Sequence, residues 1–149
     1  MVLKREFSEG RKKRMMRTLM SRRIRATGPD EATVQAVVIR ERGCCLVCGD
    51  PLNGARGVGW SIHHRRGRDG KPDSHTVQNL IAVCGGDNVT GCHGRIHQRR
   101  SESQPAGWWL SRVAGTDPLT VPLLVDRESR WVYLTAAGTY AHEAPGVEG

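Results

Sequence analysis

The sequence is poor in aromatic residues and in long apolar runs. Phe, Trp and Tyr make up only 5% of its 149 residues, and the mean hydropathy is −0.49. A chain of this length suggests one domain with a small core, which a bound metal ion would help to stabilise. No apolar run is long enough to span a membrane, and the basic N-terminus lacks the apolar stretch of a signal peptide. We therefore expect a cytoplasmic protein with no membrane partner.

Acidic residues are scarce relative to basic ones, which gives a net charge of +8 and a pI of about 9.9. Residues 1–30 hold ten Lys and Arg residues and three acidic ones, whereas residues 31–149 hold thirteen and twelve. The excess charge thus lies in a basic arm, residues 1–28, which we expect to be partly disordered. Such an arm favours a nucleic acid as partner, with Lys12, Lys13 and Arg14 as contacts. The alternative is a solvated basic face with no specific role.

Local patterns predict two helices, two strands and a late hairpin. Asp30 suits the start of a helix that runs to about Arg42, with Val34, Val37 and Val38 as its apolar stripe. Residues 58–64 and 79–84 are predicted as strands, and a second helix runs from His93 to about Arg100. Residues 121–125 and 131–135 form the late hairpin, and the last dozen residues are disordered. Trp108 and Trp109 are expected to pack rather than to stack on bases.

Five cysteines in a cytoplasmic chain indicate a metal site more than disulfides. Cys45-x2-Cys48 and Cys84-x7-Cys92 together supply four thiolates, which suit a closed tetrahedral zinc site of structural function. Cys44 could replace Cys45, although the two-residue spacing favours Cys45. Buried or redox-active thiols are the alternative.

Four histidines are arranged around the two predicted strands and the second helix. His63 and His64 are the last residues of the first predicted strand, and their side chains point to opposite faces, so they can have different functions. His93 and His97 are four residues apart, so they share one face of a helix and can bind one ion together. Alternatively, either of them completes a mixed Cys/His zinc site.

The ordered set of His63-His64, Asn79 and His93-x3-His97, framed by the cysteines, resembles the ββα-metal motif of HNH endonucleases. The stretch from Cys84 to His97 is similar to the form found in tailed-bacteriophage HNH proteins. The match covers about residues 45–100. The resemblance implies an α+β fold, a small zinc-stabilised ββα-metal domain over residues 29–137. It would have an N-terminal brace helix and a C-terminal β extension, followed by a tail, residues 138–149.

The resemblance also implies a role for each residue. His64 would be the general base that takes a proton from the attacking water, and Asn79 would brace the loop that presents it. His63, His93 and His97 would hold one catalytic divalent ion that polarises the scissile phosphate. Many HNH proteins have an acid where His63 stands, and three imidazoles favour Zn²⁺, Ni²⁺, Co²⁺ or Mn²⁺ over Mg²⁺. The implied products carry a 5′-phosphate and a 3′-hydroxyl.

The predicted function is therefore a metal-dependent DNA endonuclease with little sequence specificity. Arginines near the histidines would contact phosphates without reading sequence; they are Arg65, Arg66, Arg68, Arg95, Arg99 and Arg100, with Arg95 the favoured one. The resemblance further implies phage DNA packaging, phage terminase subunits as a partner and the host cytoplasm as the location. A non-catalytic zinc module that binds DNA is the alternative, and RNA remains open as a substrate.

Overall fold

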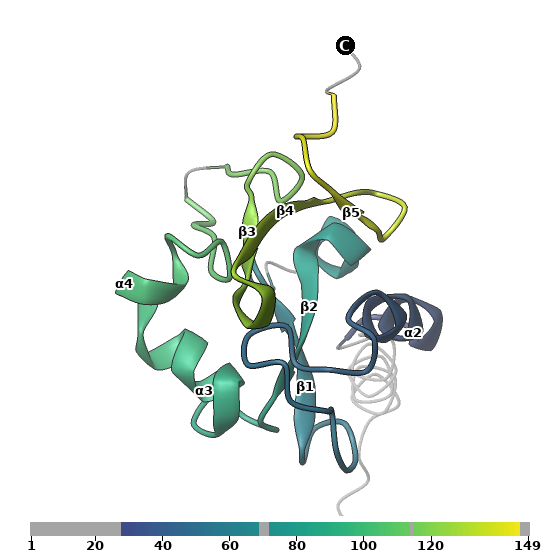
Figure 1. The fold of residues 1–149 in the computed structure, drawn as a ribbon, viewed down its shortest axis with the longest axis vertical. Helices are drawn as coiled ribbons and strands as arrows, with labels where there is room; N and C mark the ends of the chain where they lie inside the picture. Colours follow the sequence, from purple (N-terminus) through teal and green to yellow (C-terminus); the bar gives the residue numbers. More distant parts are fainter. Residues whose placement is uncertain (1–27, 69–71, 114, 147–149) are drawn as a thin grey trace, which may run out of the picture.

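The computed structural model describes residues 28–68, 72–113 and 115–146. These residues form a small mixed α/β domain with three α-helices and two small antiparallel sheets (Figure 1). The α-helices are α2 (Glu31–Arg40), α3 (Gly91–Gln98) and α4 (Arg100–Ser103). The strands are β1 (Trp60–His64), β2 (Leu80–Cys84), β3 (Leu123–Val125), β4 (Arg130–Leu134) and β5 (Tyr140–Ala141); the 3-10 helices are η1 (Pro72–His75), η2 (Val77–Asn79) and η3 (Asp126–Glu128). No described helix has the length and apolar character needed to cross a membrane.

Helix α2 begins at the predicted place because the Asp30 carboxylate caps it, accepting a hydrogen bond of 2.7 Å from the backbone N–H of Thr33. It ends at Arg40, two residues earlier than predicted, where Arg42 and then Gly43 adopt positive φ angles of 55° and 68°. Its buried residues Val34 and Val37 pack on one face of the β1–β2 hairpin.

The β1–β2 hairpin is the centre of the domain, with α2 on one side and α3 on the other (Figure 1). His63 pairs with Ile81, and His64 pairs with Leu80. Because neighbouring residues of a strand face opposite ways, His63 lies on the face covered by α3 and the C-terminal sheet. His64 lies on the face that carries α2. The strand begins at Trp60 rather than at the predicted residue 58, since residues 57–59 form a turn.

The predicted late hairpin is present as β3 and β4, and its apolar residues enter the main core beside Ile81 and Val83. Trp108 is only 2% exposed and donates a hydrogen bond from Nε1 to the Leu124 carbonyl, so it packs as predicted. The prediction of a disordered tail is wrong for Tyr140 and Ala141, which form β5 against β4. The basic arm, including Lys12, Lys13 and Arg14, lies outside the described residues.

Candidate metal centres and catalytic cavity

Four cysteines from distant parts of the chain converge on one point. Cys45 and Cys48 lie between α2 and β1, Cys84 ends β2, and Cys92 is the second residue of α3. Their Sγ atoms all lie within 4.8 Å of one another, and none forms a disulfide. Four sulfur donors at this spacing can hold a metal ion in a closed tetrahedral site. Cys44 is not part of the cluster, and its thiol instead donates to the Arg42 carbonyl.

Glycines explain how the wide Cys84-x7-Cys92 spacing still brings the two thiols together. Gly85 and Gly91 have positive φ angles of 97° and 58°, which L side chains rarely adopt. A Cβ on Gly85 would also clash with the Thr90 carbonyl. The loop therefore returns on itself, and the backbone N–H of Cys92 donates to the Sγ of Cys84 over 3.3 Å.

The electrostatics of the cysteine cluster fit a bound cation. A hydrogen bond from Cys92 lowers the pKa of Cys45 to about 5, so one thiolate forms readily. Burial raises the pKa of Cys48 to about 12, with the neighbouring Cys45 adding to the effect. Four thiolates cannot coexist here without a compensating positive charge, and a metal ion supplies that charge.

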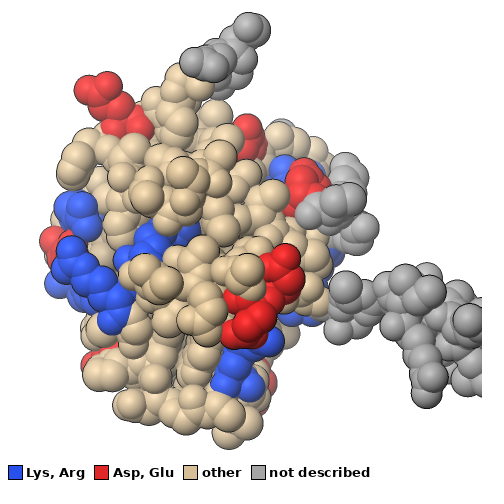
Figure 2. Space-filling view, turned by 90° about the vertical axis from the view of Figure 1, so that its right-hand side faces the viewer, with Lys and Arg blue, Asp and Glu red and all other residues tan. Residues whose placement is uncertain are grey.

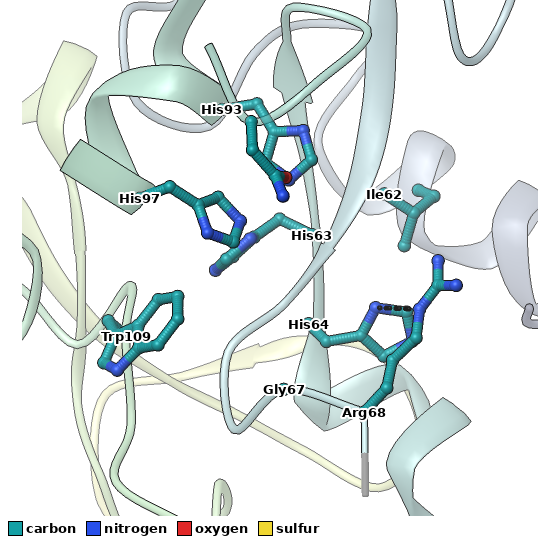
Figure 3. Close-up of a pocket in the computed structure, with 9 residues that line it drawn as sticks. Ile62, His63, His64, Gly67, Arg68, His93, His97 and Trp109 are labelled. Carbon is teal, nitrogen blue, oxygen red and sulfur yellow. Dashed lines mark hydrogen bonds between the residues drawn. The ribbon is translucent and has the colours of Figure 1, made fainter. Parts of the chain in front are cut away.

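A second cluster contains the three histidines predicted to hold a catalytic ion. His63 comes from β1, and His93 and His97 share one face of α3 (Figure 3). One ring nitrogen from each lies within 4.8 Å of the others. The cysteine and histidine clusters are separate groups, which disfavours the mixed Cys/His site.

Hydrogen bonds to backbone and hydroxyl groups fix two of these rings in a ligating form. His63 Nε2 lies 3.0 Å from the Trp108 carbonyl, which can only accept, so Nε2 carries the proton and Nδ1 keeps a lone pair. His93 Nδ1 lies 2.8 Å from Ser61 Oγ, whose own proton goes to the Gly85 carbonyl. Ser61 therefore accepts from His93, and His93 Nε2 keeps its lone pair. Such outer partners are typical of metal-binding histidines.

Burial keeps the three imidazoles neutral, as metal ligation requires. It lowers the pKa of His63 well below its ordinary value and that of His93 to about 4, and neighbouring histidines add to both effects. The pKa of His97 is lowered for the same first reason. The donor set therefore fits a divalent ion of the kind that imidazole prefers, such as zinc, nickel or cobalt.

His64 stays outside the three-histidine cluster but lines the same cavity of about 370 Å³. Figure 3 shows its ring beside Arg68, whose Nε donates to His64 Nδ1 over 3.5 Å. The other ring nitrogen, Nε2, lies 3.0 Å from Nδ1 of His75. Burial lowers the pKa of His64 to about 4, and the positive Arg68 contributes next.

Asn79 is fully buried and connects two loops. Its side-chain oxygen accepts from the backbone N–H of Arg66 at 2.8 Å, and its amide nitrogen donates to the Ser74 carbonyl at 2.9 Å. Asn79 thus holds the residues that follow His64, as the prediction of a bracing role requires.

The prediction that Arg65 contacts DNA is wrong, because its side chain is 0% exposed. Its guanidinium lies inside the domain and donates to the backbone carbonyls of Gly107, Gln78, Pro118 and Val121. Three of these bonds join the residue after β1 to the segment between α4 and β3, and the bond to Gln78 reaches η2.

Arg95, the favoured phosphate contact, does not face the three-histidine cluster, and its contact with a phosphate stays a prediction. It lies between His93 and His97 in sequence but on another face of α3, where its guanidinium sits over Trp108 and pairs with Glu102. Arg100 instead lies over Trp109, a residue of the cavity wall, at 4.6 Å from the ring centre. Arg99 is exposed and pairs with Glu102, and Arg66 pairs with Asp73.

A second cavity of about 290 Å³ adjoins the first, because Ile62, Arg68 and His93 line both. Arg56 lines this extension. On the face drawn in Figure 2, groups of cationic and of acidic side chains lie near one another. The two adjoining cavities are therefore lined by Arg68 and Arg56, two cationic side chains that an anionic ligand bound there would meet.

His75 is the site residue that sequence reasoning misses. It lies between the two predicted strands, eleven residues from His64, and no local pattern gives it a role. Comparison of the chain with protein-family models, with curated proteins and with solved structures finds no match. The function of the protein is therefore inferred from the residues of the chain itself.

Proposed function

We propose that this protein is a metal-dependent endonuclease of the HNH type that hydrolyses DNA phosphodiester bonds. One observation carries the proposal: three neutral imidazoles converge on one point, while a fourth, His64, lines the same cavity without joining them. A site that only bound a metal ion would need no such additional histidine.

The donor set supports one divalent ion held by His63, His93 and His97, with positions left open for oxygen ligands. When bound, that ion would polarise the phosphate and stabilise charge on the leaving oxygen. The four cysteines would hold a second ion, a zinc that stabilises the fold. Cys92 and His93 are adjacent, so the cysteine site fixes the start of the helix that carries two of the three histidines.

His64 is the base in this proposal. Its neutral ring accepts a hydrogen bond from Arg68 at Nδ1, so Nδ1 has the lone pair that can take a proton from water. A bound phosphate would draw the Arg68 guanidinium into an ion pair and leave this position to the attacking water. The same pairing offsets the positive charge of Arg68, the second cause of the lowered His64 pKa, and so strengthens the base.

The cationic groups support a polynucleotide as substrate. Arg68, Arg56 and Arg100 lie along or beside the joined cavities. The basic arm adds ten Lys and Arg residues within the first thirty positions. Such contacts favour any phosphate backbone and give affinity without sequence readout. DNA as the polymer, phage DNA packaging, a terminase partner and the host cytoplasm follow from the resemblance to tailed-bacteriophage HNH proteins.

The second candidate function is a non-catalytic zinc module that binds DNA. The closed four-cysteine cluster favours it, because such a cluster serves structure rather than chemistry. The two candidates differ in what they require of His64.

Plasmid cleavage tests the proposal. Purified wild type, His64→Ala and His142→Ala are each assayed with EDTA, Mg²⁺, Mn²⁺, Ni²⁺, Co²⁺ or Zn²⁺. His142 is exposed and lies outside the cavity, so its variant controls for loss of a histidine as such. We expect metal-dependent cutting by wild type and His142→Ala, and none by His64→Ala. Equal cutting by all three would contradict the role of His64, and no cutting by wild type under any metal would favour the binding module.

A further inference from the structure

The two histidines that face each other across the end of the hairpin, His64 and His75, form a hydrogen bond with a definite direction. Nε2 of His64 and Nδ1 of His75 are 3.0 Å apart, so one of them donates and the other accepts. The ring centres are 5.1 Å apart and the planes nearly perpendicular, at 71°. The distance alone does not tell which nitrogen carries the proton.

The contact with Arg68 shows which of the two histidines donates the hydrogen bond. A guanidinium has only donors, and the Nε of Arg68 points its proton at Nδ1 of His64. Nδ1 must therefore be the unprotonated nitrogen of the neutral His64 ring, which places the proton on Nε2. His64 donates to His75, and His75 Nδ1 is the acceptor.

Two further contacts hold the segments that carry this pair. Asn79 bonds to the backbone of Arg66, two residues after His64, and to the backbone of Ser74, the residue before His75. The Arg66 guanidinium also pairs with the Asp73 carboxylate at 2.7 Å, which joins the same two segments a second time. The relative position of the two histidines is thus set by contacts on both sides, with Asn79 fully buried.

We propose that His75 is a positioning residue for His64. By accepting the Nε2 proton, it holds the His64 ring in one tautomer and one orientation, with the Nδ1 lone pair toward the cavity. When a bound phosphate draws Arg68 away from Nδ1, His75 is the hydrogen-bond partner that still orients the ring. Without His75 the ring could then carry its proton on either nitrogen, and the form protonated at Nδ1 cannot take a proton there. The effect on catalysis rests on the proposed nuclease function, whereas the tautomer is a property of the folded chain.

The first test compares His75→Ala with His75→Asn in the full-length, metal-loaded protein. The Asn side-chain oxygen lies near the place of the lost Nδ1 and restores an acceptor. We expect His75→Ala to lower kcat for plasmid cleavage by about 10–100-fold, the size of effect known for losing the outer partner of a metal-ligating histidine, with KM and metal content unchanged. His75→Asn should recover most of the rate. A normal kcat in His75→Ala, or equal losses in both variants, would overturn the proposal.

The second test does not depend on activity. Long-range ¹H–¹⁵N spectra of the zinc-loaded protein report which nitrogen of each histidine is protonated, and His64→Ala identifies the His64 signals. Both proteins compared also carry Arg68→Ala, so that the Arg68 contact cannot set the tautomer. We expect the Nε2-protonated form of His64 where His75 is present and a mixture of forms where it is replaced by alanine. The same single tautomer in both proteins would refute the proposal. If the tautomer result holds but wild type cuts no DNA, the nuclease function fails and the positioning contact stands.

Discussion

Replacing Arg65 with alanine should destabilise the domain without acting through DNA. The wild-type guanidinium donates to four backbone carbonyls, at 2.7 Å to Gly107, 3.3 Å to Gln78, 3.0 Å to Pro118 and 2.9 Å to Val121. Each buried acceptor that loses its donor costs about 1–3 kcal/mol. The bonds to Gln78 and Val121 are only partly buried, so water can replace them. Two acceptors remain buried without a donor, so we expect the free energy of unfolding to fall by about 2–6 kcal/mol.

Arg99→Ala is the matched control, because the Arg99 side chain is 64% exposed. Among the ion pairs of the described residues, Arg99 pairs only with Glu102, whose side chain is 47% exposed. Its loss should change the free energy of unfolding by less than about 1 kcal/mol. Urea denaturation of the zinc-loaded proteins measures both values, and DNA binding is measured on the fraction that remains folded. Unchanged stability of Arg65→Ala together with weakened DNA binding would refute the buried role of Arg65.

Three further predictions test other parts of the molecule. Cys48→Ala should release zinc and unfold the domain, whereas Cys44→Ala should keep both the zinc and the fold. Metal analysis of the purified variants checks this prediction. A folded Cys48→Ala variant that still binds zinc would show that Cys48 is not a ligand. Deletion of residues 1–25 should weaken DNA binding and reduce its dependence on salt concentration, because most of the excess positive charge is lost. DNA affinity measured at several salt concentrations checks this. An unchanged slope of affinity against salt would place the phosphate contacts elsewhere. Tyr140→Phe should lower the free energy of unfolding by about 2 kcal/mol, because the Tyr140 hydroxyl donates to the buried Glu41 carboxylate. Urea denaturation measures this change, and no change would show that the hydrogen bond does not stabilise the fold.

The sequence is most informative where a pattern has a fixed period. Strand alternation places His63 and His64 on opposite faces, and the four-residue spacing puts His93 and His97 on one face of α3. The same helical period places Arg95 on another face than His93, since a residue two positions away lies about 200° around the helix. The sequence therefore already separates Arg95 from the face of His93 and His97, although Arg95 lies between them along the chain.

Contacts between distant segments could not be predicted from local patterns. The carbonyls that bind Arg65 come from residues 13 to 56 positions away, and nothing in its own neighbourhood distinguishes it from the exposed arginines. His75 meets His64 where Asn79 and the Arg66–Asp73 pair join the two segments. Strand β5 is short and forms through pairing with β4 and the contact of Tyr140 with Glu41.

The central claim is that His63, His93 and His97 bind the catalytic ion while His64 acts as the base. One paired measurement tests it most directly. The binding of a catalytic divalent ion to the zinc-loaded protein is measured by calorimetry in His64→Ala and His97→Ala, beside plasmid cleavage by the same preparations. We predict that both variants lose cutting, that His97→Ala loses the ion, and that His64→Ala binds it with near wild-type affinity. Loss of the ion in His64→Ala, or normal cutting by either variant, would contradict the claim.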